Sequence, residues 1–128
     1  MYLFVYGTLR QNTGTAMHGI LAHNSEFFGM GLLQGKLYLV GDYPGVVLSD
    51  NPADRVLGEL YAISQAHVLG LMDEYEECTD EHPQPHEYIR RICPVKTETG
   101  LRVDAWVYLF NHATDNLRSI VSGDFINR

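Results

Sequence analysis

Short hydrophobic runs, many with the two-residue period of β-strands, contain most of the apolar positions in the chain. Residues 2–6 are all aromatic or branched, with no polar residue on either alternate face, which is typical of a central strand covered on both sides. Residues 26–40 are also rich in apolar side chains, but glycines interrupt them, as in bent or paired strands. Further strands are predicted at residues 46–48, 55–63, 86–96 and 102–110.

Two segments have helical spacing instead. Residues 16–23 predict a short helix, and Ser64 can cap a longer one that runs from residue 65 to about residue 77. Residues 116–125 predict a helical or irregular closing segment. The pattern therefore predicts one domain over residues 1–128, in which about six strands and two helices share a core.

The composition supports one globular domain and narrows the partners. A chain of 128 residues with 45% hydrophobic content can bury a core without staples. Its formal net charge of -7 would repel nucleic acids and anionic membranes, so neither is expected as a partner. No apolar run approaches the roughly 20 residues of a membrane span, and the N-terminus lacks a signal-peptide pattern. Cys78 and Cys93 are too few for a disulfide framework, which favours a reducing, cytoplasmic location.

The first strand ends at Gly7, where small polar and basic residues begin. A glycine there allows a positive φ or a close approach to a ligand. The amides of Gly7, Thr8 and Leu9 could then point together as donors to an anion or an oxyanion. The alternative is an ordinary turn, because glycine commonly follows a strand. The spacing alone leaves both interpretations open.

The predicted helix at residues 65–77 contains four acids, which a helical projection places in different environments. The projection predicts a buried stripe formed by Val68, Leu69, Leu71, Met72 and Tyr75. Glu76 falls between Met72 and Leu69, whereas Asp73, Glu74 and Glu77 point away. Loss of hydration would raise the pKa of Glu76 towards neutrality, so Glu76 is a candidate general base. The alternative is that the helix ends near Glu76 and leaves it solvated.

Glu59 is the one acid within the predicted strand at residues 55–63. Its face of the strand is otherwise apolar, since it alternates with Leu57, Tyr61 and Ile63. Glu59 is therefore either a site acid or an edge residue that points to solvent. Glutamate is rarely fully buried, which favours the solvent-facing position.

Cys78, His82 and His86 recur at intervals of four residues, a spacing that metal sites can use. Pro83 and Pro85 exclude the helix that would bring these side chains to one face. No fourth ligand follows at a recognised spacing. We therefore predict a solvated loop here and no bound metal.

Eight stretches, by their order and spacing, resemble one known family. They are residues 4–10 (FVYGTLR), 35–38 (GKLY), 41–45 (GDYPG), 56–61 (VLGELY), 72–76 (MDEYE), 88–91 (YIRR), 105–108 (AWVY) and 122–125 (SGDF). Over its whole length the chain is similar to the gamma-glutamylcyclotransferase-like superfamily, and in particular to its small single-domain AIG2-like and YtfP-like members. The resemblance implies an α+β fold: a closed or nearly closed barrel of mixed strands with about two helices.

The resemblance also implies a site at the mouth of the barrel. Tyr6, Gly7, Thr8 and Leu9 would form the substrate cradle, and Glu76 would be the catalytic acid/base. In the implied reaction, the free α-amine of a γ-glutamyl group attacks its own side-chain amide carbonyl. The reaction releases an amine or amino acid and forms 5-oxoproline. Because the nucleophile belongs to the substrate, the resemblance implies no cofactor, no metal and no catalytic serine or cysteine.

Further expectations follow from the same resemblance. Tyr88 would border the pocket or hydrogen-bond the substrate, unless it only packs, as strand tyrosines often do. The expected partner is a small γ-glutamyl molecule, and a homodimer is compatible with the family. The alternative function is a non-catalytic module that binds a γ-glutamyl or carboxylate metabolite on the same fold.

The chain departs from the family pattern at two positions. Glu77 stands where the family often has glycine after its catalytic glutamate, and Met72 stands where it usually has leucine. The Met72 exchange conserves packing. Glu77 adds a negative charge beside the candidate base. The loop from Cys78 to Glu87 is specific to this chain or its subgroup and is expected to shape substrate choice.

Overall fold

The computed structural model describes residues 1–7, 9–10, 15–76, 79 and 84–128. Its elements follow the chain in the order β1 (Tyr2–Val5), α1 (Ala16–His23), β2 (Ser25–Val40), β3 (Tyr43–Leu48), β4 (Arg55–Ile63), α2 (His67–Tyr75), β5 (Tyr88–Thr97), β6 (Arg102–Phe110) and β7 (Arg118–Ser119). The predicted α+β class is confirmed, with both helices close to their predicted positions.

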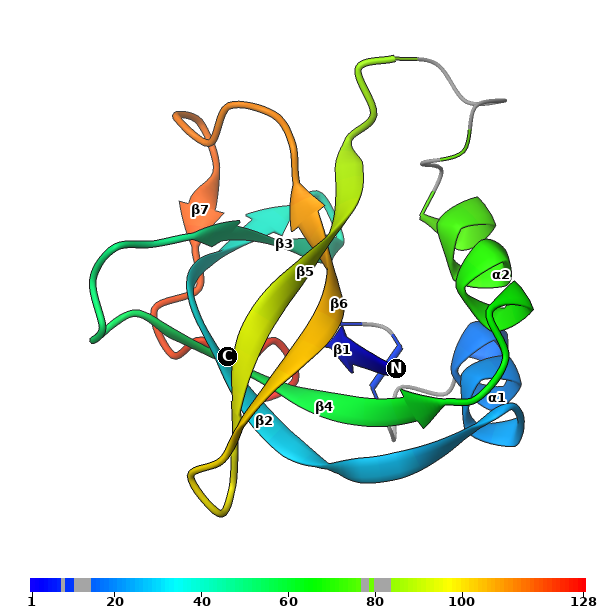
Figure 1. Ribbon diagram of the computed structural model, residues 1–128. Helices are drawn as coiled ribbons and strands as arrows, with labels where there is room; N and C mark the ends of the chain where they lie inside the picture. Colours follow the sequence, from blue (N-terminus) through cyan, green and yellow to red (C-terminus); the bar gives the residue numbers. More distant parts are fainter. Residues whose placement is uncertain (8, 11–14, 77–78, 80–83) are drawn as a thin grey trace.

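The strands close into a barrel (Figure 1). Strands β1, β4, β2, β3 and β6 follow one another around the wall, and β6 returns to β1 through the parallel pair Leu3 and Trp106. Strand β5 pairs with β6 along its length and also reaches β2 at Gly31 and Leu32. The predicted closed barrel of mixed strands is therefore confirmed.

Strand β2 shows how the sequence bends the wall. Residues 26–40 were expected to form bent or paired strands, and they belong to one strand that pairs with both β3 and β4. Its register shifts between Phe27 and Gly29, and Gly29 has a φ of 151°. At Gly31 a Cβ atom would lie 2.7 Å from Cγ1 of Val95. Glycine is needed there because β5 packs too closely for a side chain.

Two apolar clusters hold the fold together. The interior of the barrel is filled by one cluster, which includes Phe4, Tyr6, Leu33, Val56, Leu60, Cys93, Val95 and Val107. The second cluster joins the outside of the wall to α1 and α2, and it includes Leu3, Val5, Leu21, Val68, Met72, Tyr88 and Tyr108. Strand β1 contributes to both clusters, because its alternate side chains point to opposite faces. The prediction that this strand is covered on both sides is therefore confirmed.

The end of the chain lies against the barrel without forming a helix. Residues 116–125 contain turns and the two-residue strand β7, which pairs with β2. The amide of Leu57 donates to the carbonyl of Gly123 at 2.8 Å, and Gly123 has a φ of 70°. A Cβ atom at Gly123 would meet the carbonyl oxygen of Arg55. A glycine is therefore required where the tail crosses β4.

Across the part of the chain that the structure describes, neither helix is long and apolar enough to cross a membrane.

Candidate active site

A small cavity opens where the end of β1 meets β3, β6 and the end of α2. Its volume is about 40 Å³, and its walls are Phe4, Val5, Tyr6, Gly7, Leu9, Tyr43, Pro44, Glu76 and Tyr108. The loop after β1 and the candidate base, which are separated by most of the chain, therefore share one cavity. The loop and Glu76 can act on one substrate only if they share a cavity in this way.

Tyr6 forms the inner wall of the cavity and is 6% exposed. Its hydroxyl donates to the carbonyl oxygen of Tyr108 at 2.6 Å and accepts from the amide of Val46 at 3.4 Å. Burial, and then the charge of Glu76, raise the pKa of this hydroxyl well above its usual value of 10.0. Tyr6 therefore stays a neutral donor that joins β1 to β6 and β3.

Gly7 is required by a close approach between two cavity walls. A Cβ atom at this position would lie 2.6 Å from Cγ of Pro44. The carbonyl of Gly7 accepts from the amide of Arg10 at 3.0 Å, which closes a turn. The carbonyl of Leu9 lies 2.7 Å from Nδ1 of His18 on α1. The loop after β1 therefore contains a turn, and its binding role stays a prediction; Thr8 lies outside the described residues.

Glu76 caps the C-terminus of α2 and faces the cavity. The helix ends at Tyr75, and the amide of Glu76 donates to the carbonyl of Met72 at 2.9 Å. The carboxylate is partly buried and has no counter-ion or hydrogen-bond partner among the described residues. Burial, and then the negative charge of Glu87, raise the pKa of Glu76 from 4.5 to about 7. Near neutral pH this carboxyl group can both accept and donate a proton.

The helical projection was correct for one side of α2 and wrong for the other. Val68, Leu69 and Met72 are buried, as predicted, but Leu71 is 44% exposed and Tyr75 is 39% exposed. The buried face of α2 is therefore narrower than the projection predicted. Glu76 lies within the remaining arc, so it turns inwards even though the helix ends before it.

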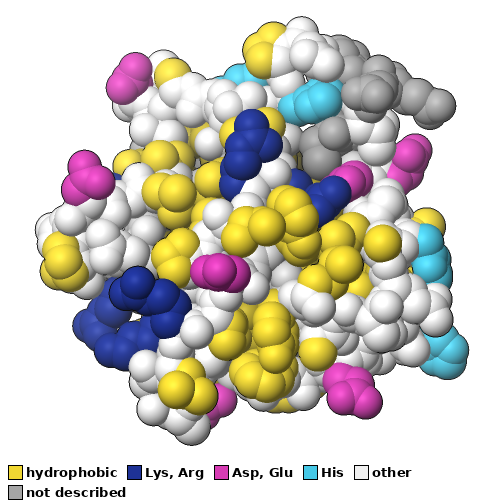
Figure 2. Space-filling view, in the orientation of Figure 1, with side chains coloured by type: hydrophobic (Ala, Val, Ile, Leu, Met, Phe, Trp, Pro, Cys, Tyr) yellow, Lys and Arg dark blue, Asp and Glu magenta, His cyan; other side chains and the backbone are white. Residues whose placement is uncertain are grey.

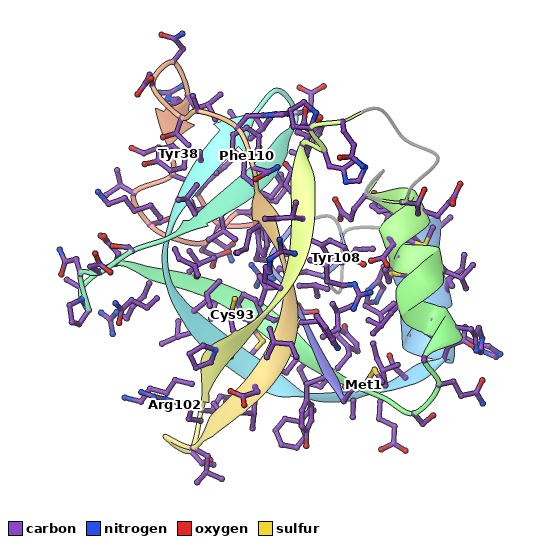
Figure 3. All side chains as sticks on the ribbon, turned by 45° about the horizontal axis from the view of Figure 1, so that its top comes forward. Met1, Tyr38, Cys93, Arg102, Tyr108 and Phe110 are labelled. Atoms are coloured by element: carbon purple, nitrogen blue, oxygen red, sulfur yellow. The ribbon has the colours of Figure 1, made fainter. Side chains whose placement is uncertain are left out.

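Asp73 anchors α2 one turn before Glu76. Its two carboxylate oxygens accept from Nε and Nη2 of Arg90 at 2.7 and 3.0 Å. The Tyr108 hydroxyl donates to Oδ1 of Asp73 at 2.6 Å. The guanidinium of Arg90 also stacks on Trp106, 4.3 Å from the ring centroid. Figure 3 shows Tyr108 on the side of the barrel that faces α2. This network fixes the end of α2, and thereby Glu76, against the barrel wall.

Tyr88 supports the cavity from behind. It is buried, and its hydroxyl donates to the carbonyl of Pro44 at 2.7 Å. Burial is the main cause that raises the pKa of Tyr88 far above 10.0. Its ring contacts Tyr43, whose hydroxyl donates to Oε1 of Glu87 at 2.7 Å. Tyr88 thus holds the Pro44 wall in place, and contact with a substrate stays a prediction.

Glu59 is buried, so its predicted solvent-facing position is wrong. It is 4% exposed, and Nε of Arg10 lies 3.4 Å from its Oε2. The Tyr61 hydroxyl donates to Oε1 of Glu59 at 2.9 Å, and Arg10 also contacts Asp124 at 2.8 Å. The guanidinium of Arg10, just beyond the loop that follows β1, compensates the cost of burying this carboxylate.

The structure does not describe all three residues that recur at intervals of four, Cys78, His82 and His86. Cys78 and His82 lie outside the described residues, and Nε2 of His86 is buried without a hydrogen-bond partner there. Within the described ranges no three metal-ligating side chains form a group that could hold an ion.

Tyr43, Pro44 and Tyr108 line the cavity but were not predicted as site residues. The sequence presented Tyr43 and Pro44 as parts of a turn and Tyr108 as a strand residue. A strand pattern shows which face a side chain occupies, but not which chain segment lies opposite it. The pairing of β3 with β6, which brings these walls together, is a long-range feature.

Comparisons with known proteins agree with this architecture. A family model described as gamma-glutamyl cyclotransferase, AIG2-like, matches residues 3–127. The Escherichia coli K12 gamma-glutamylcyclotransferase family protein YtfP is 32% identical over 129 residues, which covers 100% of this chain and 98% of that protein. The Methanocaldococcus jannaschii relative MJ1514 is 26% identical over 124 residues, and the match covers 97% of this chain and 94% of that protein.

Solved structures share the fold. The solution structure of Escherichia coli ytfP has a TM-score of 0.67 and 31% identity, and the match covers 100% of this chain and 98% of that chain. A crystal structure of a mouse aig2-like protein has a TM-score of 0.71 and 25% identity, with coverage of 92% and 84%. The likeness therefore spans the barrel and both helices.

Proposed function

Because this chain belongs to the gamma-glutamyl cyclotransferase, AIG2-like family, we propose that it cyclises a γ-glutamyl substrate to 5-oxoproline, with Glu76 as acid/base. The observation that carries the proposal is the shared cavity of Glu76 and the loop after β1. The pKa of about 7 for Glu76 supports a proton-transfer role.

In the proposed reaction the substrate supplies the nucleophile. Glu76 takes a proton from the α-ammonium group, and the resulting amine attacks the γ-carbonyl carbon. A new C–N bond closes the five-membered ring, and the original amide C–N bond breaks. Glu76 then returns the proton to the leaving nitrogen. The ring nitrogen loses a second proton on closure, which passes to the released amine as it becomes an ammonium group, so no net proton is gained or lost. The protein accelerates ring closure mainly by holding the amine against the carbonyl.

The loop after β1 would bind the negative charge in this reaction. Amides of Gly7, Thr8 and Leu9 hold the substrate carboxylate or the oxyanion that develops on the carbonyl. The neutral Tyr6 hydroxyl keeps the inner wall rigid through Tyr108. In this proposal Tyr88 supports the cavity wall through its hydrogen bond to the carbonyl of Pro44.

Substrate binding requires the cavity to widen. A volume of about 40 Å³ holds little more than a water molecule, whereas a γ-glutamyl group is several times larger. Tyr43 is 43% exposed and is the most exposed aromatic residue among those that line the cavity. We expect Tyr43 to rotate away when a substrate enters.

The test is an assay of 5-oxoproline release from a panel of γ-glutamyl compounds: amino acid, lysine and polyamine conjugates. Glu76→Gln keeps the shape of the side chain and removes the proton shuttle, so turnover should fall by about 10²- to 10⁴-fold. Glu74→Gln is the matched control, because Glu74 is exposed on the same helix. Its rate should equal that of the wild type. A Glu76→Gln variant with wild-type turnover would contradict the assignment.

A binding module would give a different result in the same experiment. Its melting temperature would rise with a γ-glutamyl compound or a small carboxylate, without release of 5-oxoproline from any member of the panel. The cytoplasmic location and the homodimer stay predictions. Size-exclusion chromatography with light scattering would test the dimer.

A further inference from the structure

A second and larger hollow lies on the outer face of the barrel. It has a volume of about 710 Å³ and shares no lining residue with the cavity of Glu76. Three cations line it: Arg55 at the start of β4, Lys96 on β5 and Arg102 on β6. In Figure 2, Lys and Arg side chains surround a hollow at the lower left of the molecule. We call this hollow the cationic groove.

The strand register brings these three cations to one face. Lys96 and Arg102 are direct cross-strand partners, so their side chains leave the sheet on the same side. Strand β2 lies on the other side of β5, and its Leu32 pairs with Lys96. Strand β4 pairs with the opposite edge of β2, and there Gln34 pairs with Arg55. Leu32 and Gln34 are two residues apart and share a face. The cations thus converge from neighbouring strands.

This concentration of charge is unfavourable without a ligand. Like charges directly opposite each other on a sheet destabilise it. The chain has nine Lys and Arg residues against sixteen Asp and Glu residues, so counter-charges are plentiful. Even so, none of the three cations forms an ion pair with another described residue.

Two acids lie near the groove and do not neutralise it. Glu98 lines it, but its Oε1 accepts from the amide of Met30 at 2.9 Å. Asp104 follows Arg102 by two residues on the same strand and is exposed. The lining itself carries three positive charges and one negative charge, which leaves a net attraction for anions.

The remaining lining indicates the kind of anion. Arginine guanidinium groups bind phosphate with paired N–H donors, and lysine adds a point charge. The hydroxyls of Thr97 and Thr99 lie 3.0 Å apart in the same groove and can donate to phosphate oxygens. Leu32, Pro52 and Pro94 supply an apolar surface for an organic group. The volume falls within the range of about 300–1,000 Å³ that is usual for small-molecule sites.

We propose that the cationic groove binds a small organic diphosphate of the nucleoside-diphosphate class. The convergent cations and hydroxyls hold the phosphoryl groups, and the apolar residues pack against the organic part. A longer nucleic acid is disfavoured because the protein as a whole carries a net charge of -7. The proposal is independent of the reaction at Glu76.

Isothermal titration calorimetry of the full chain with ADP, pyrophosphate and adenosine tests the proposal at constant ionic strength. ADP should bind most tightly, pyrophosphate more weakly, and adenosine without measurable heat. Arg55→Gln, Lys96→Gln and Arg102→Gln should each weaken ADP binding about tenfold, because each removes a charged contact. The triple variant should show no binding at millimolar ADP.

The matched control is a triple variant of Lys36→Gln, Arg91→Gln and Arg118→Gln, which changes the net charge equally outside the groove. It should retain ADP binding. Without ligand, the groove variant should melt at or above the wild-type temperature, since it relieves repulsion. If it fails to fold, the single Arg102→Gln variant decides the outcome. The proposal is overturned if ADP does not bind, if both triple variants bind alike, or if a single-stranded oligonucleotide binds more tightly than ADP.

Discussion

Glu59 and Glu76 are both glutamates in largely apolar surroundings, but they differ in their partners. Glu59 lies inside β4 and is held by Arg10 and the Tyr61 hydroxyl. Glu76 lies at the end of α2, faces a cavity and has no counter-ion among the described residues. Burial, and then the negative charge of Glu87, raise the pKa of Glu76 to about 7. The Glu59 carboxylate, with its cation, serves the fold, whereas the raised pKa of Glu76 supports the proton-transfer role that we propose for it.

The largest expected effect comes from breaking the Glu59 pair. Arg10→Met should lower the free energy of unfolding by about 3–5 kcal/mol, because it leaves the buried Glu59 carboxylate without its cation. Arg91→Met should change it by less than about 0.5 kcal/mol, since Arg91 is exposed. Urea unfolding at neutral pH measures both. Equal effects would show that Arg10 does not compensate Glu59.

Removing the charge of Glu76 should stabilise the protein, whereas breaking the Glu59 pair destabilises it. The folded-state pKa of Glu76 lies above its ordinary value, so its contribution to stability is full below pH 4.5 and is lost as the pH rises through 7. Glutamine cannot ionise, so Glu76→Gln should raise the free energy of unfolding by about 2 kcal/mol at pH 8. This figure is smaller than the full pKa shift would give, because Glu76 is partly exposed to water. Near pH 4 the gain should vanish.

Urea unfolding of Glu76→Gln and Glu59→Gln at both pH values gives the direct contrast. Glu59→Gln should destabilise the protein at pH 8, because the neutral amide weakens the contact with Arg10. If both variants lose stability at pH 8, Glu76 is a structural acid like Glu59.

The smallest expected effect comes from Glu87. Its negative charge contributes to the raised pKa of Glu76, after burial. Glu87→Gln should therefore move the acid limb of the pH profile of kcat/KM to lower pH, by about half a unit. The substituted amide keeps an oxygen that can accept from the Tyr43 hydroxyl, so the wall is preserved. An unchanged acid limb would mean that burial alone raises the pKa of Glu76.

Much of the fold was predictable because it depends on local patterns. The alternation within residues 55–63 and 102–110 predicted those strands, and the family stretches predicted the barrel. The inward orientation of Glu76 followed from the spacing of Leu69 and Met72, which are both buried. Local periodicity thus predicted the side of α2 that faces the barrel.

The features that were missed depend on partners far away in the sequence. Glu59 was expected at the surface because its cation, Arg10, is 49 residues away, and a strand pattern does not show such a pair. Tyr43 and Tyr108 became cavity walls only through the pairing of β3 with β6. Leu71 was expected to be buried, but it is 44% exposed, because helical spacing alone does not show how wide a face of α2 the barrel covers.

The most direct test of the central claim is the ionisation of Glu76 itself. Carbon-13 NMR of the glutamate carboxyl groups, followed from pH 3 to pH 9, gives each midpoint, and Glu76→Gln identifies the signal of Glu76. We predict a midpoint of about 7 for Glu76. A midpoint near 4.5, the ordinary value for glutamate, would contradict the proposal that this carboxyl group is prepared for proton transfer.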